Sequence, residues 1–165
     1  PDVLFSPVVE EGARTKTQYL PAGPSGWVDF WTGMLHPAGA TVTVDAKLGQ
    51  PPIFIRAGAV LALASETPAI KPHDAPARQL YVAAVGDVGH ATGNHIEDDG
   101  TSWAFREGDM LACRFEAEWS AKELVLRIQR SAGQRPLPDS SAWRLSSPAL
   151  AGRRVRIVNA GDAAR

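Results

Sequence analysis

The sequence has a single cysteine, Cys113, among its 165 residues. One cysteine cannot form an intramolecular disulfide, so the fold cannot be stabilised by disulfide bonds within the chain. The sequence also lacks a basic and apolar signal stretch and any run of about 18 apolar residues, the features of secretion and of membrane-spanning helices. From these absences we expect a cytoplasmic protein with no membrane partner.

An excess of charge of either sign is missing as well. Lys and Arg number 17 against 18 Asp and Glu, which gives a formal net charge of −1, so nucleic acid and anionic membranes are poor partners. The sequence has no Gly-rich phosphate loop, no nucleophile elbow and no zinc-binding cysteine pair. We therefore expect no cofactor.

Turn-forming residues are plentiful, with 15 Gly and 13 Pro. They separate about a dozen short extended runs, and no convincing long helix lies between them. A chain of this length can bury one core or two small ones. The pattern predicts an all-β fold of two small β-sandwich-like domains.

The best candidate for a linker is the segment 65–78, which holds three prolines and little apolar content. We therefore predict a first, proximal β domain over residues 1–70 and a second, distal β-sandwich domain over residues 71–165. The chain opens at Pro1 and enters the strand-like run 3–5 at once. We interpret it as a fragment of a longer polypeptide.

The middle of the first predicted domain is rich in aromatic residues. If the run 27–31 is a strand, its side chains alternate between two faces, with Trp27, Asp29 and Trp31 on one face. Val28 and Phe30 then lie on the other, and both faces are largely apolar. Such a strand is usually covered on both sides, by its own core and by another layer or domain.

The second predicted domain has one clear strand and one ambiguous segment. From Leu111 to Trp119 apolar and charged residues alternate, which places Cys113 on the apolar face as a small buried hydrophobe rather than a nucleophile. The segment 120–130 fits both a helix that starts with a capping box at Ser120 and a strand. We choose the strand because the segment is short and the chain around it is β.

An acidic run, Glu97, Asp98 and Asp99, is the most obvious candidate for chemistry. Asp-Asp-Gly is also what a tight turn prefers, and we favour the turn over catalysis or metal binding. Two histidines, His90 and His95, could join Glu97 and Asp98 as metal ligands, but their spacing matches no metal motif. We expect a solvated loop over 86–100.

Five motifs together carry a family resemblance. They are Phe5–Ala13 (FSPVVEEGA), Tyr19–Gly23 (YLPAG), Trp27–Gly33 (WVDFWTG), Ile53–Leu61 (IFIRAGAVL) and Glu97–Ser102 (EDDGTS). In this order they resemble the segment that follows the catalytic barrel in glycoside hydrolase family 31, the α-glucosidases and α-xylosidases. The resemblance implies a non-catalytic C-terminal portion, since the family's catalytic aspartates lie in the barrel, upstream of every matched motif.

The same resemblance implies a parent enzyme and partners. The parent would hydrolyse terminal α-linked glucosyl or xylosyl residues of an oligosaccharide with retention, and the barrel of the same chain would be the partner of the first domain. Trp27, Phe30 and Trp31 are then candidates for contact with the barrel or for stacking on a sugar. The second domain is a candidate for joining subunits of a homo-oligomer.

Two other functions stay open. The chain could be a carbohydrate-binding module that uses exposed aromatic residues, or a free-standing β protein that mediates protein contacts. In each of the three hypotheses the chain itself has no catalytic residue.

Overall fold

A computed structural model describes residues 1–63 and 78–159 of the chain. Within those residues it has thirteen β-strands and three short 3-10 helices, so the all-β prediction is confirmed. The chain divides into two compact units, Pro1–Ala59 and Val60–Arg165.

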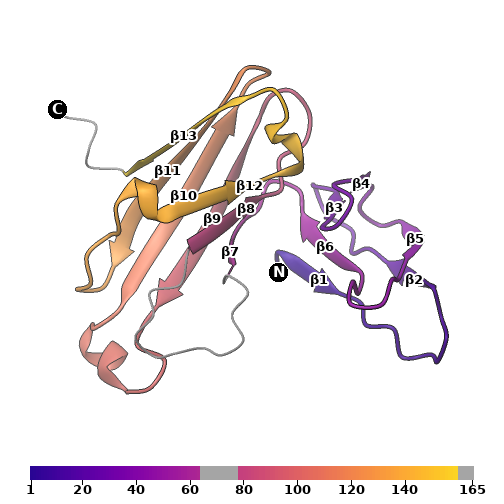
Figure 1. Cartoon of the computed structure of the whole chain (residues 1–165), viewed down its shortest axis with the longest axis horizontal. Coiled ribbons are helices and arrows are strands. Elements are labelled where there is room, and N and C mark those ends of the chain that lie inside the picture. The colour runs from indigo at the N-terminus through magenta and orange to yellow at the C-terminus, as the bar shows by residue number, and fades with distance from the viewer. Residues whose placement is uncertain (64–77, 160–165) are drawn as a thin grey trace. The chain divides into compact units, whose positions relative to one another are not determined.

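The first unit consists of a four-stranded sheet and a two-stranded ribbon (Figure 1). The sheet has the order β1-β6-β3-β4 and is antiparallel throughout, and the ribbon pairs β2 with β5. The strands are β1 (Val3–Phe5), β2 (Thr15–Tyr19), β3 (Trp27–Asp29), β4 (Leu35–His36), β5 (Thr41–Asp45) and β6 (Ile53–Arg56). Two features of this unit, a small core and an apolar outer face, bear on its role.

The core of the first unit is small. Leu20, Trp27 and Phe54 are buried together, and Leu4, Ala38, Val42 and Val44 pack against them at partial burial. Val42 and Val44 alternate with exposed threonines along β5, so the strand buries only one of its faces.

The other face of the four-stranded sheet is apolar too. Residues paired across antiparallel strands project to the same face, and the pairing places one set together: Val3, Phe5, Val28, Leu35, Ile53 and Ile55. We call this set the apolar outer face. At its centre Val28 and Ile55 are buried, whereas Val3, Phe5 and Leu35 at its margins are about half exposed.

The predicted strand over 27–31 is wrong after Asp29. The buried Asp29 carboxylate accepts the backbone N–H groups of Trp31 and Thr32, at 2.9 and 2.8 Å. Gly33, at φ 73°, donates its N–H to the Asp29 carbonyl and closes a turn. Trp27 and Trp31 therefore do not share the face of one strand.

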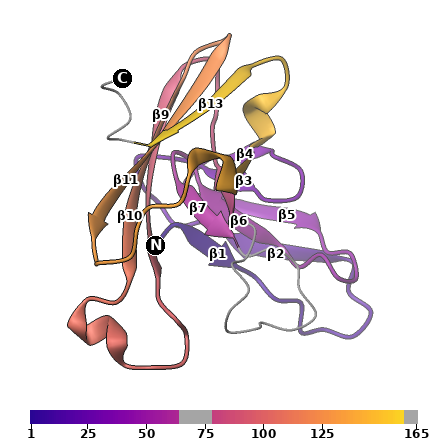
Figure 2. The same cartoon turned by 60° about the vertical axis from the view of Figure 1, so that its left-hand side comes forward.

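The second unit is built from two sheets (Figures 1 and 2). One has the order β13-β11-β10-β9 and the other β12-β8-β7, and the pairs β11–β13 and β8–β12 are parallel. Its strands are β7 (Val60–Leu63), β8 (Arg78–Val82), β9 (Gly89–Glu97), β10 (Leu111–Trp119), β11 (Glu123–Ala132), β12 (Trp143–Ser146) and β13 (Arg154–Asn159). The 3-10 helices are η1 (Ala104–Glu107), η2 (Ser140–Ala142) and η3 (Pro148–Leu150).

The core of the second unit is much larger than that of the first. Fourteen buried residues from both sheets form one cluster. The alternation predicted for β10 is confirmed, with Cys113 and Phe115 fully buried. The ambiguous segment after Ser120 is a strand, β11, as predicted, and its Leu124, Leu126 and Ile128 enter the same core.

The loop predicted over 86–100 is wrong for most of its length, because Gly89–Glu97 is the nine-residue strand β9. The inward positions of β9 are Ala91 and Gly93, which are too small to give an apolar strand signal. Gly93 has a structural reason to be small, since a Cβ atom there would lie 2.0 Å from the Val60 carbonyl oxygen.

The predicted linker over 65–78 and the predicted domain boundary at residue 70 lie almost entirely outside the described residues. Strand β7 pairs with β8, which is why the contacts group residues from Val60 onward with the second unit. The boundary at residue 70 stays a prediction. Within the described chain, no helix has the length and apolar character needed to cross a membrane.

Candidate functional site

The acidic run at the end of β9 has the geometry of a turn. Asp98 Oδ1 accepts the Gly100 N–H at 2.8 Å, and Asp99 Oδ1 accepts those of Thr101 and Ser102. The Ser102 hydroxyl donates to Asp99 Oδ2 at 2.6 Å. These hydrogen bonds lower the pKa of Asp99 to about 2, and the bond from the Ser102 hydroxyl has the largest effect. The ionised carboxylate shapes the segment that carries η1 beyond the ends of β9 and β10 (Figure 2).

Glu97, the first residue of the acidic run, forms an ion pair with Arg78 instead of a turn. Arg78 Nε and Nη2 donate to its two carboxylate oxygens at 3.0 and 2.5 Å, and His95 Nε2 lies 3.5 Å from Oε2. Burial raises the pKa of Glu97, but the hydrogen bonds and charges of Arg78 and His95 outweigh it and lower the pKa from its ordinary value. Glu97 thus ties β9 to β8, in the other sheet of the unit.

The four residues weighed as metal ligands do not converge. His90 and His95 are five positions apart on one strand, so they project to opposite faces of β9. His95 stacks on Phe115 with ring centroids 6.3 Å apart, while His90 is exposed. In residues 1–63 and 78–159 no group of three or more His, Cys, Asp or Glu side chains could hold a metal ion.

Cys113 is buried in the larger core. Burial first, and then the charge of Glu97, raise the pKa of its thiol to about 11. A thiol of this kind is protonated at neutral pH and has little nucleophilic character. Its interpretation as a small buried hydrophobe is confirmed.

The three aromatic residues of the first unit lie in different surroundings. Trp27 is 5% exposed and donates its indole N–H to the Pro21 carbonyl within the core. Trp31 is 43% exposed and donates its indole N–H to the Pro51 carbonyl at 2.7 Å. Phe30 meets the Trp31 ring edge-on, with centroids 5.0 Å apart.

Trp31 lines a groove of about 530 Å³, which we call the Trp31 groove. It lies between the turn after β3 and the strand β5. Its lining residues are Asp29, Trp31, Thr32, Met34, His36, Thr43, Val44, Asp45, Lys47 and Gln50. The sequence alone did not reveal it, because the turn and β5 come together only through the fold.

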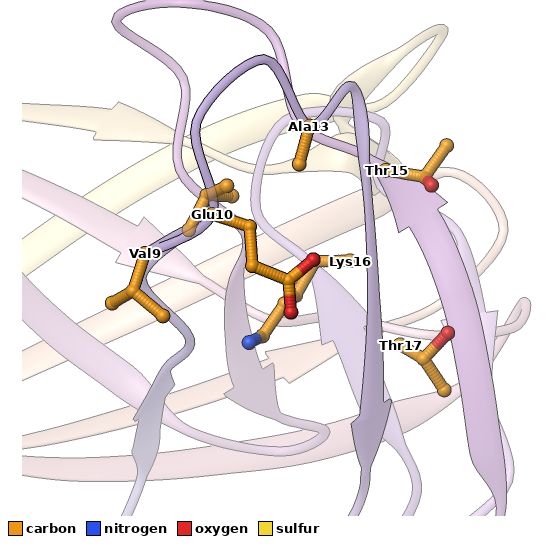
Figure 3. Close-up of a pocket in the computed structure, with 7 residues that line it drawn as sticks. Val9, Glu10, Ala13, Thr15, Lys16 and Thr17 are labelled. Atoms are coloured by element: carbon orange, nitrogen blue, oxygen red, sulfur yellow. The ribbon is translucent and has the colours of Figure 1, made fainter.

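Two further cavities flank the loop between β1 and β2. The smaller, about 270 Å³, receives the side chains of Glu10 and Lys16, whereas Thr15 and Thr17 point away from these two (Figure 3). The larger, about 470 Å³, extends to the hairpin 46–51. Val9 and Leu48, on these two loops, are 80% and 96% exposed.

Exposed apolar side chains are concentrated in the first unit. It contains eight of the twelve large hydrophobic residues that are exposed in the described chain, although it is the shorter of the two units. The eight are Val3, Phe5, Val9, Tyr19, Trp31, Met34, Leu35 and Leu48.

Comparison with known proteins identifies the first unit. Residues 1–61 match the family model of the glycosyl hydrolase family 31 C-terminal domain. Alpha-glucosidase 2 of Bacillus thermoamyloliquefaciens is 27% identical over 146 residues, which cover 88% of this chain and 17% of that protein. The alpha-xylosidase of Saccharolobus solfataricus is 41% identical over 63 residues, covering 38% of this chain and 8% of that protein.

The fold of both units also occurs in solved structures. A family 31 dextranase of Flavobacterium johnsoniae, complexed with glucose, matches with a TM-score of 0.69 at 23% identity, over 84% of this chain and 17% of that one. The likeness shows the shared fold. The chain thus spans 17% or less of the length of each of these three proteins.

Proposed function

We propose that the first unit of this chain braces the catalytic barrel of a parent enzyme. The premise is that the chain is a C-terminal, non-catalytic portion of a glycoside hydrolase family 31 enzyme. The parent hydrolyses terminal α-linked glucosyl or xylosyl residues of oligosaccharides. It does so with retention, through a covalent glycosyl-enzyme and two barrel carboxylates roughly 5 Å apart.

The observation that carries this proposal is the surface of the first unit. Exposed large apolar side chains that are concentrated in one part of a protein often mark the place where a partner binds, and eight of the twelve in the described chain lie in the first unit. Val3, Phe5 and Leu35 at the margins of the apolar outer face are 46%, 56% and 48% exposed. Only seven hydrophobic residues are buried in this 59-residue unit. So small a buried set gives it little stability of its own, and an apolar neighbour would stabilise it.

The described carboxylates support a non-catalytic role. Two of them have structural partners: Asp29 accepts backbone N–H groups in the turn after β3, and Glu97 forms an ion pair with Arg78. Asp99 shapes its own turn. A retaining glycosidase needs two carboxyl groups that are free to act as nucleophile and as acid, whereas each of these three is engaged in a turn or an ion pair.

The first experiment is an immunoblot of source cells with an antibody raised against this chain. We expect a polypeptide many times larger than 17.6 kDa, with room for a barrel of about 250 residues. A natural product near 17.6 kDa would instead support a free-standing β protein and contradict the proposal.

A second experiment tests the contact surface directly. We expect the purified 165-residue chain to self-associate in analytical ultracentrifugation, because its apolar surface has no barrel to cover it. The double variant Phe5→Ser and Leu35→Ser should shift the population towards monomer. The control is Val88→Ser in the second unit, at a residue 76% exposed, which should leave the association unchanged.

The second unit is our candidate for joining subunits of a homo-oligomer. Full-length parent and a version that ends at Ala59, the last residue of the first unit, should then differ in oligomeric state by size-exclusion chromatography with light scattering. Equal oligomeric states would contradict this role.

A further inference from the structure

We propose that the Trp31 groove is a binding site for carbohydrate, separate from the active site that the parent's barrel would contain. The site would hold a stretch of oligosaccharide against the face of the Trp31 indole. Three features of the groove carry this inference: a fixed aromatic ring, uncommitted polar side chains beside it, and a suitable volume.

The Trp31 ring is held in place from several sides. Its backbone N–H is bound by the buried Asp29 carboxylate at 2.9 Å, and its indole N–H by the Pro51 carbonyl at 2.7 Å. The edge-on contact with Phe30 adds a third restraint. A ring fixed in this way loses little conformational entropy when a ligand stacks on it.

The ring is nonetheless accessible, with 43% of the residue exposed. Sugar rings have faces of C–H groups, and these suit the negatively charged face of an indole. Trp103 in the second unit is more exposed, but the Arg106 guanidinium lies over one face of its ring, 4.3 Å from the centroid.

Polar side chains beside the ring are uncommitted. Asp45, Lys47 and Gln50 are exposed, and their side chains form no hydrogen bond or ion pair with any described residue. They supply a carboxylate acceptor, an ammonium donor and an amide that both donates and accepts. Sugar hydroxyls need both kinds of partner, which favours a carbohydrate over a purely apolar ligand.

The groove also has a suitable size. Its volume of about 530 Å³ lies within the range of roughly 300–1,000 Å³ that is common for small-molecule sites. Seven of its ten lining residues are polar, and Trp31 is the one large aromatic residue among them. An apolar ligand or an apolar helix would leave most of these polar groups without partners.

The choice of sugar rests on the proposed function. A parent that acts on α-linked glucosyl chains would gain from a second contact with the same chain, through a raised effective concentration at the active site. We therefore expect α-linked glucose oligosaccharides to bind.

The test is an NMR titration of the 165-residue chain with isomaltotriose, maltotriose and the β-linked cellotriose. The Trp31 indole N–H signal, assigned by its loss in Trp31→Phe, should shift saturably with an α-linked sugar, with a Kd of about 1 mM. The variant Trp31→Ala should abolish binding. The control Trp103→Ala, at a residue 68% exposed in the second unit, should leave binding unchanged.

A milder variant covers the case in which Trp31→Ala disturbs the turn. Gln50→Ala removes only an exposed side chain and should weaken binding about tenfold without changing the remaining spectrum. Absence of any saturable shift up to about 10 mM sugar would overturn the site, while the immunoblot would still decide the proposed function. Equal binding of cellotriose would overturn the choice of α-linked sugars.

Discussion

At the scale of single residues, Gly93 shows how a small side chain can be required by a neighbouring strand. It pairs with Phe115 in the middle of β9, where a larger residue would normally strengthen a strand. A Cβ atom at this position would lie 2.0 Å from the Val60 carbonyl oxygen and 3.0 Å from the Val60 Cβ. The backbones of β7 and β9 can approach this closely only because residue 93 is glycine.

We therefore expect Gly93→Ala to destabilise the second unit by about 3 kcal/mol, the upper range for overpacking a well-packed interior. Urea unfolding followed by tryptophan emission measures the change. The matched control is Gly23→Ala, where an added Cβ meets nothing within 4 Å. A loss in Gly93→Ala no larger than in this control would contradict the close approach.

Cys113 gives a second prediction at this scale. Because burial raises the pKa of its thiol to about 11, almost no thiolate exists near pH 8 in the folded state. We expect alkylation by iodoacetamide at about pH 8 to be at least 100-fold slower in the native chain than in the urea-unfolded chain. Mass spectrometry reports this on the single cysteine, and rapid native labelling would show that the thiol is accessible.

At the scale of elements, the ion pair of Glu97 and Arg78 joins the ends of two strands that belong to different sheets. Both side chains are largely buried, 25% and 15% exposed. The folded-state pKa of Glu97 is lowered relative to that of the unfolded chain, so the ion pair stabilises the fold above the unfolded-state pKa. This contribution is lost as the pH falls through the folded-state pKa.

We expect Glu97→Gln to cost about 2 kcal/mol at neutral pH, the range of a hydrogen bond to a charged group. The difference in free energy of unfolding from the unmodified chain should narrow as the pH falls through the lowered folded-state pKa of Glu97, where its carboxyl becomes neutral as well. Urea unfolding across this pH range measures it. Glu107→Gln, at an exposed residue of η1, is the control, and a difference that does not change with pH would count against the ion pair.

Elements with large alternating side chains could be predicted from the sequence, and those with small ones could not. In β10 the buried positions hold Phe115 and Trp119, so the period of two is plain. In β9 they hold Ala91 and Gly93, so the same period is hidden and the segment looks like a loop. The strand predicted beyond Asp29 failed for another reason, since hydropathy does not show that a carboxylate will bind two backbone N–H groups.

The same limit applies to the candidate sites. The turn at Asp98 and Asp99 could be predicted because its residues are adjacent in the sequence. The Trp31 groove could not, because Trp31 and Asp45 meet across it only after β5 has paired with β2. Contacts of this kind are set by topology, and a single sequence carries no local signal for them.

At the scale of the whole molecule, the two units differ greatly in how much they bury. Seven hydrophobic residues are buried in the first unit, against seventeen in the described part of the second. Stability grows with the apolar surface removed from water. Units with separate cores can also unfold separately.

We therefore expect the 165-residue chain to unfold in urea in two transitions, with the first unit unfolding at the lower concentration. Phe54→Ala should lower only the first urea midpoint, and Phe115→Ala should lower only the second. Each substitution should reduce the free energy of unfolding of its own unit by about 3–5 kcal/mol. Both side chains are fully buried, so the two variants control for each other. A single transition that both variants shift equally would show that the units fold as one, and that the first unit does not depend on a barrel for its stability.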